Sequence, residues 1–307
     1  MGEAIFYKQL EAVYSEDRGA LSGPRESDIE LKNGYHIKIE QGVIRTITIS
    51  NNNEVNARDL YAILTFVERL LMLFDGKFYN LKEMKFSESQ NDAHRLYGYA
   101  SNIVNSARLS YFVSDGYCYA GRICSFNDVL TADLYENWVK LVEELDISHQ
   151  VYLYSMSANK MPVDLRVAFL VELAEPLVEL IKNRTGLFPA LSPGNWGTTL
   201  KMCLEELIKK YGMEIFQKEM NTNSDKFLQF LVNSRVRIMH IKKNQRGIYM
   251  NGDESILYIM KISLLYRHIL LSLLGIGEKE TIEQIKKDVS AFDNWNDTLK
   301  KVLIKIQ

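Results

Sequence analysis

The chain has 307 residues, of which 47% are hydrophobic and 25% are charged, with five prolines. This length suits two ordinary domains better than one large core, and the composition excludes collagen-like, low-complexity and mostly disordered chains. Its three cysteines are too few and too scattered for a disulfide framework or a four-cysteine zinc site. Buried structural thiols are the expected outcome.

No targeting or membrane segment is expected from the sequence. The first residues lack the charged start, long apolar run and small-residue cleavage site of a signal peptide. The most apolar run, residues 256–276, is interrupted by Lys261, Arg267 and His268, so we expect no membrane-spanning segment. The sequence therefore predicts a soluble cytoplasmic protein that does not engage a membrane.

Charge is distributed unevenly along the chain. Residues 160–307 carry 22 Lys or Arg and 17 Asp or Glu, whereas residues 1–159 carry 15 and 22. One acidic and one mildly basic half indicate two domains with different roles. The basic half is far weaker than in typical duplex-DNA-binding domains, so charge alone does not identify a nucleic-acid partner.

The first half, residues 1–155, is predicted to be a β-rich α+β domain. Asn33-Gly34 supplies the positive φ angles of a tight turn between two strands, and residues 43–50 (VIRTITIS) read as a third strand. Asn56 is a suitable N-cap for a helix that Gly76 ends. The predicted elements are strands at 28–31, 35–40 and 43–50, a helix at 57–74, an extended segment at 77–86, strands at 109–113 and 117–123, and a helix at 132–145.

The second half, residues 156–307, is predicted to be an all-α bundle of four or five helices. Its apolar residues recur at helical spacing, and Gly and Pro separate the segments. Pro162 suits the first turn of the first helix. The predicted helices are 162–182, 200–211, 225–242, 254–274 and 282–289.

The sequence contains none of the common catalytic motifs, but one cationic segment is a candidate functional site. Residues 231–246 read LVNSRVRIMHIKKNQR. On a helix turning by about 100° per residue, Arg235 falls inside an apolar arc and His240 lies about 140° around from it. A buried arginine needs a carboxylate, a subunit boundary or a bound anion, and Glu175 is a candidate structural partner. The segment is either a structural ion pair with a solvated basic end or a phosphate site.

The segment from Asn233 to His240 resembles the R-x4-6-H motif of the HEPN superfamily (higher eukaryotes and prokaryotes nucleotide-binding domains). The apolar segment 258–276, YIMKISLLYRHILLSLLGI, resembles the family's next helix, and residues 164–180 resemble its first helix, whose central glutamate is matched by Glu175. Residues 70–81 and the helix around Trp138 resemble the β-rich N-terminal domain of ApeA-like HEPN proteins. Many active members carry a polar residue after the arginine, where this chain has Val236.

The resemblance implies a metal-independent endoribonuclease that needs no cofactor. In it, His240 would be the acid and base for attack of an RNA 2′-OH, and Arg235 would stabilise the phosphate. The cations expected to bind the RNA substrate are Arg237, Lys242, Lys243 and Arg246.

The resemblance also implies a homodimer. Because the helical projection separates Arg235 from His240, we expect two copies to form one composite site. A role in phage defence or as a toxin is expected, with a trigger or neutralising protein as a further partner. The alternative is a catalytically inactive module that binds RNA, a nucleotide or a protein.

Overall fold

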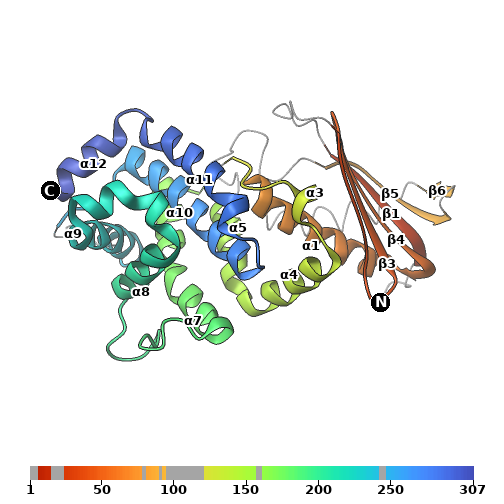
Figure 1. Ribbon diagram of the computed structural model, residues 1–307, viewed down its shortest axis with the longest axis horizontal. Helices are drawn as coiled ribbons and strands as arrows, with labels where there is room; N and C mark the ends of the chain where they lie inside the picture. Colours follow the sequence, from red (N-terminus) through yellow and green to blue (C-terminus); the bar gives the residue numbers. More distant parts are fainter. Residues whose placement is uncertain are drawn as a thin grey trace. The chain divides into compact units, whose positions relative to one another are not determined.

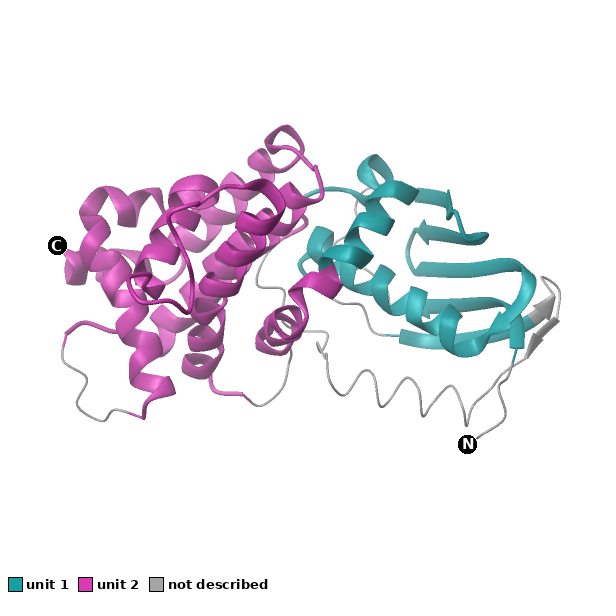
Figure 2. Ribbon diagram, turned by 90° about the horizontal axis from the view of Figure 1, so that it is seen from below, with its two compact units in different colours: residues 1–117, 124–141 teal, residues 118–123, 142–307 magenta. Residues whose placement is uncertain are grey.

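The computed structural model describes residues 6–14, 24–77, 81–89, 92–94, 121–156, 161–241 and 247–307. The chain divides into two compact units, residues 1–117 with 124–141 and residues 118–123 with 142–307 (Figure 2). The border between them falls inside helix α4 (Ala132–Leu145). The predicted domain border at residues 155 and 156 stays a prediction, because compactness does not by itself define an independently folding domain.

The first unit contains an antiparallel sheet with the strand order β2-β3-β4-β1-β5-β6. Buried and exposed residues alternate along its strands, so that Leu10, Ile37, Ile39 and Ile49 point into one core. The strands are β1 (Phe6–Tyr14), β2 (Arg25–Glu30), β3 (Tyr35–Gln41), β4 (Arg45–Asn56), β5 (Leu81–Ser89) and β6 (Asp92–His94).

Local sequence signals set the helix ends of this unit as predicted, and the turn only in part. The hairpin between β2 and β3 turns through Gly34, whose φ is 82°, but Asn33 does not adopt the positive φ that was expected of it. Helix α1 (Ala57–Asp75) begins where the Asn56 side chain accepts a hydrogen bond from the Arg58 N–H, and it ends at Gly76, whose φ is 75°. Helix α1 and the short helix α3 (Phe126–Val129) cover one face of the sheet (Figure 1).

The first unit contains a buried ion pair. Arg45 on β4 donates to Asp75 Oδ2 at 2.7 Å, and both side chains are at most 3% exposed. Arg45 also donates to Gln41 Oε1 at 2.5 Å. On α4, the Trp138 indole donates to the Phe66 carbonyl of α1 at 2.8 Å, which fixes the two helices side by side.

The second unit is helical, and the predicted α+β and all-α fold class is confirmed. Helix α4 ends within this unit. The following elements are α5 (Ile147–Met156), α6 (Val163–Glu172), α7 (Ala174–Thr185), α8 (Leu200–Leu207), a π-helical turn (Ile208–Gly212), α9 (Met213–Met239), α10 (Gly252–Leu273), α11 (Glu278–Asp293) and α12 (Thr298–Ile306). Lys261 of α10 ties three of these helices together, because its buried ammonium lies 2.7 Å from both Glu219 of α9 and Asp293 of α11.

The helices predicted in the second half of the chain have different limits in the structure, α5 and α12 were not predicted, and two of the predicted helices change most. The single helix expected at 162–182 is wrong: it breaks at Leu173 into α6 and α7. Pro176 explains the break, since a proline lacks the N–H and its ring clashes with the carbonyl four residues earlier, that of Glu172. The helix expected at 225–242 belongs to the longer helix α9, which ends at Met239. Within α9, Asn223 leaves helical geometry, and its side chain caps a restart at the Lys226 N–H.

Helix α10 corrects the expectation that no apolar run is long enough to cross a membrane. By length and composition Gly252–Leu273 could span one, but 78% of its apolar window is buried inside the protein. That burial is the pattern of a core helix. Of the strands predicted at 109–113 and 117–123, residues 109–120 lie outside the described residues, and residues 121–123 form no strand.

Candidate active site at the end of α9

Arg235, on the last turns of α9, forms an ion pair with Glu172 at the end of α6. Its Nε donates to Glu172 Oε2, and its Nη2 donates to Glu172 Oε1 at 2.7 Å. The side chains are 20% and 37% exposed, so the pair lies at the surface of the helical unit. The bond to Glu172 raises the pKa of Arg235 further above its ordinary value, and the guanidinium therefore stays charged.

His240 meets Arg235 within one chain. His240 Nε2 lies 3.3 Å from Arg235 Nη1, in position to accept a hydrogen bond when the imidazole is neutral. The expectation that the two side chains diverge by about 140° is wrong, because it extended helical geometry past Met239. His240 is the C-cap residue, with φ −105° and ψ 8°, and Ile241 follows with a φ of 50°.

The turn after His240 resembles a helix ending that usually uses glycine. The His240 N–H donates to the Val236 carbonyl at 3.1 Å, and the Ile241 N–H donates to the Ile238 carbonyl at 3.2 Å. A β-branched residue rarely adopts a positive φ, and such strain concentrates at functional sites. Ile241 is nevertheless 86% exposed, so packing of its side chain does not account for the conformation.

The hydrogen-bonded partner of Arg235 is Glu172 rather than the predicted Glu175. The break before Pro176 separates the two glutamates, since Glu172 ends α6 and Glu175 lies in the first turn of α7. Burial raises the pKa of Glu175, the nearby Glu172 carboxylate raises it further, and Arg235 opposes the shift. Glu175 thus acts on the site through its charge.

The segment that returns to α10 is fastened to the same part of α9. Asn233 Nδ2 donates to the Ile248 carbonyl at 3.0 Å, and the Met250 N–H donates to Ser234 Oγ at 2.9 Å. Gly247 has a φ of 90°, and a Cβ there would lie 2.9 Å from Asn233 Nδ2. These contacts hold residues 247–250 against α9.

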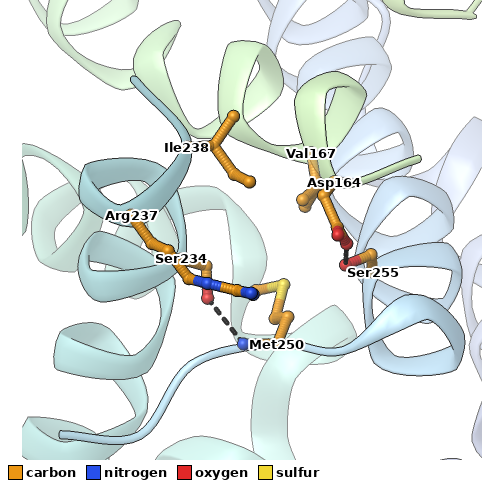
Figure 3. Close-up of a pocket in the computed structure, with 7 residues that line it drawn as sticks. All are labelled: Asp164, Val167, Ser234, Arg237, Ile238, Met250 and Ser255. Atoms are coloured by element: carbon orange, nitrogen blue, oxygen red, sulfur yellow. Dashed lines mark hydrogen bonds between the residues drawn. The ribbon is translucent and has the colours of Figure 1, made fainter. Parts of the chain in front are cut away.

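Arg237 points to a different place from Arg235. Its guanidinium carbon lies 4.3 Å from the centre of the Tyr249 ring, a cation–π contact. It also lines a narrow crevice between α6, α9 and α10, where Asp164 accepts a hydrogen bond from Ser255 (Figure 3). The crevice is too narrow to admit a water molecule.

The remaining predicted site residues, Lys242, Lys243 and Arg246, lie outside the described residues. Among the residues that are described, no three His, Cys, Asp or Glu side chains gather as a metal-ligand set. Cys203 is buried, and burial raises the pKa of its thiol to about 11, so at neutral pH it is protonated and poorly nucleophilic.

The side chains at the end of α9 supply the parts for chemistry on a phosphate. A permanently charged guanidinium can bind phosphoryl oxygens through two parallel hydrogen bonds, and an exposed imidazole beside it can accept or donate a proton. Glu172 is the residue of this candidate site that the sequence did not lead us to expect. Pro176 was the available signal, since a proline breaks a helix at the preceding turn.

The protein thus belongs to the class of proteins in which a β-sheet unit is followed by a helical module. In this helical module an arginine and a histidine lie at the end of a helix. Residues 190–280 match the family model described as Apea-like HEPN, which confirms the resemblance seen in the sequence; the match covers less than a third of the chain. The helical unit thus contains a HEPN-type module. Comparisons with curated proteins and with solved structures found no match.

Proposed function

We propose that the protein is a metal-independent endoribonuclease. The observation that carries the proposal is the 3.3 Å approach of Arg235 Nη1 to His240 Nε2 inside the segment that matches the Apea-like HEPN family. His240 takes the proton of an RNA 2′-OH and returns one to the leaving 5′-oxygen. Arg235 neutralises the charge that builds on the phosphoryl oxygens.

The tethered nucleophile makes a metal or other cofactor unnecessary. The 2′-OH is already beside the phosphorus, so positioning supplies much of the rate enhancement. The products are a 2′,3′-cyclic phosphate and a 5′-hydroxyl end, and DNA resists cleavage because it lacks the 2′-OH.

A homodimer remains part of the proposal, on different grounds from the helical projection. Met239 and Ile241 flank His240 and are 39% and 86% exposed, and an apolar rim beside a polar site favours burial against a second copy. Lys242, Lys243 and Arg246 remain the proposed RNA-binding cations, whereas the Arg237 guanidinium lies against Tyr249. In a cytoplasmic phage-defence or toxin role, the β-sheet unit would restrain the nuclease until a trigger or partner protein binds.

The test is cleavage of single-stranded RNA by the full chain in the presence of EDTA. We expect His240→Ala and Arg235→Ala each to reduce the cleavage rate by about 100-fold or more. Arg184→Ala is the matched control, because Arg184 is 21% exposed and binds both oxygens of Glu144. Equal rates in all four proteins, or no cleavage by any, would overturn the proposal.

The second candidate is a catalytically inactive HEPN module that binds RNA, a nucleotide or a protein. Val236 favours it, since many active family members carry a polar residue at that position. Here the Val236 carbonyl accepts the His240 N–H, and no polar side chain takes that place in the motif. Binding of single-stranded RNA without cleavage, lost in Arg235→Ala, would favour this candidate.

A further inference from the structure

All three nitrogens of the Arg235 guanidinium contact side chains of the protein. Nε and Nη2 donate to the two oxygens of Glu172, and Nη1 lies 3.3 Å from His240 Nε2. The edge formed by Nε and Nη2 is therefore occupied by a carboxylate. This is one of the two edges through which a guanidinium binds an anion by paired hydrogen bonds.

A carboxylate and a phosphate bind to that edge of the guanidinium in the same way. Each presents two oxygens that accept two parallel N–H bonds from one arginine. An RNA phosphate that binds Arg235 in this way needs the position that Glu172 holds. Glu172 and the substrate are thus competitors for the same donors.

The local charge also opposes an additional anion. With Glu172 in place, the Arg235 charge is already balanced, and Glu175 adds a second carboxylate close enough for its pKa to be raised by Glu172 and lowered by Arg235. A phosphodiester approaching this group meets a surplus negative charge. Removing Glu172 from contact would relieve that repulsion.

Of the two side chains in the ion pair, Glu172 is the one that can move away from the site. Its side chain is 37% exposed against 20% for Arg235, so its carboxylate can turn into water at little cost. Among the described residues, Arg235 is the side chain that the structure shows hydrogen-bonded to this carboxylate.

We propose that Glu172 is an internal competitor that closes the Arg235–His240 site, and that an RNA phosphate binds only when Glu172 releases the guanidinium. This inference rests on the proposed function, because it concerns the regulation of the same site. It predicts that removing the Glu172 charge opens the site to phosphate.

The experiment measures the affinity of the full chain for inorganic phosphate by ³¹P NMR. We expect Glu172→Gln to bind phosphate at least about fivefold more tightly than the wild type, because it frees one partly exposed ion-pair donor edge. Glu175→Gln is the matched control, since it removes a neighbouring carboxylate that makes no hydrogen bond to Arg235, and it should change the affinity by less than about twofold. Arg235→Ala should abolish binding.

Two results would overturn the inference. Phosphate binding by Glu172→Gln that equals or falls below wild-type binding would mean that Glu172 holds Arg235 in its working position. An equal gain in Glu175→Gln would mean that the effect is one of general charge. If Glu172→Gln does not fold, as judged by circular dichroism, Glu172→Asp takes its place. Its side chain is one methylene shorter, which draws the carboxylate back from Arg235, so tighter phosphate binding supports the inference and unchanged or weaker binding overturns it.

RNA cleavage by the same proteins separates this inference from the proposed function. Wild-type cleavage without a phosphate gain in Glu172→Gln leaves the ribonuclease standing and overturns the inference. A phosphate gain in Glu172→Gln with no cleavage by any variant supports the closed site and overturns the ribonuclease.

Discussion

Two arginine–carboxylate pairs, one in each compact unit, have similar bonds and different surroundings. Arg45 and Asp75 are at most 3% exposed and lie in the core of the β-sheet unit, with the Phe126 ring 5.7 Å from the guanidinium. Arg235 and Glu172 are 20% and 37% exposed, and a histidine adjoins them. The first arrangement lies in a core, whereas the second places the arginine and its carboxylate partner at the surface beside a histidine.

The largest expected effect is a difference between the two ion pairs in how much folding stability is lost when the arginine is removed. Arg45→Ala removes the cation beside a buried carboxylate and should destabilise the β-sheet unit by about 3–5 kcal/mol. Arg235→Ala should cost the helical unit less than about 1 kcal/mol, because solvent screens an exposed pair. Hydrogen exchange of the β3 and β4 amides reports the first value, and exchange in α9 reports the second.

The control replaces the whole buried pair. Arg45→Met combined with Asp75→Leu should recover most of the lost stability, since a buried pair can be exchanged for apolar residues at little cost. A loss in Arg235→Ala as large as that in Arg45→Ala would remove the distinction between the two pairs.

The next effect concerns the strained turn that brings His240 to Arg235. A left-handed conformation costs a residue other than glycine about 1–2 kcal/mol. Because asparagine tolerates this conformation, Ile241→Asn should stabilise the protein by up to about 1 kcal/mol. Thermal unfolding gives the comparison with Ile241→Val, which keeps the β-branched side chain. An asparagine variant no more stable than the valine variant would contradict the strain.

The smallest effect distinguishes Glu175 from Glu172. The pKa of Glu175 is raised above its ordinary value of 4.5, so its protonated form favours the folded state. That contribution is complete below pH 4.5 and is lost as the pH rises through the folded-state pKa. Above the folded-state pKa the ionised group therefore costs stability, and Glu175→Gln should stabilise by less than about 0.5 kcal/mol there.

The pH dependence supplies the control for this variant. The difference between Glu175→Gln and the wild type should disappear in thermal unfolding below about pH 4.5. A glutamine variant that is less stable at neutral pH would show that Glu175 is a stabilising partner of Arg235 after all.

Features set by one or two residues could be predicted from the sequence. The positive φ of Gly34, the cap at Asn56 and the helix end at Gly76 are all as expected, because backbone preferences of single residues determine them. Strand β1 was missed, although it lies between β4 and β5. Its place depends on pairing with strands distant in sequence, and local patterns do not report such pairing.

Some features of the candidate site could likewise be predicted from the sequence, and others could not. Arg235 could be singled out because a charge within an apolar arc needs a partner, but the identity of that partner depended on how Pro176 breaks the preceding helix. The approach of His240 depended on a helix end without the usual glycine, since Ile241 takes the left-handed conformation. Both points depended on where the backbone leaves helical geometry.

The proposed ribonuclease activity requires Arg235 and His240 to act together on a ribose-linked phosphodiester. Mass spectrometry of the fragment ends, after incubation of single-stranded RNA with the full chain and EDTA, tests it most directly. We expect 2′,3′-cyclic phosphate and 5′-hydroxyl ends that disappear in His240→Ala. Fragments with 5′-phosphate ends, or fragments that persist unchanged in His240→Ala, would contradict it.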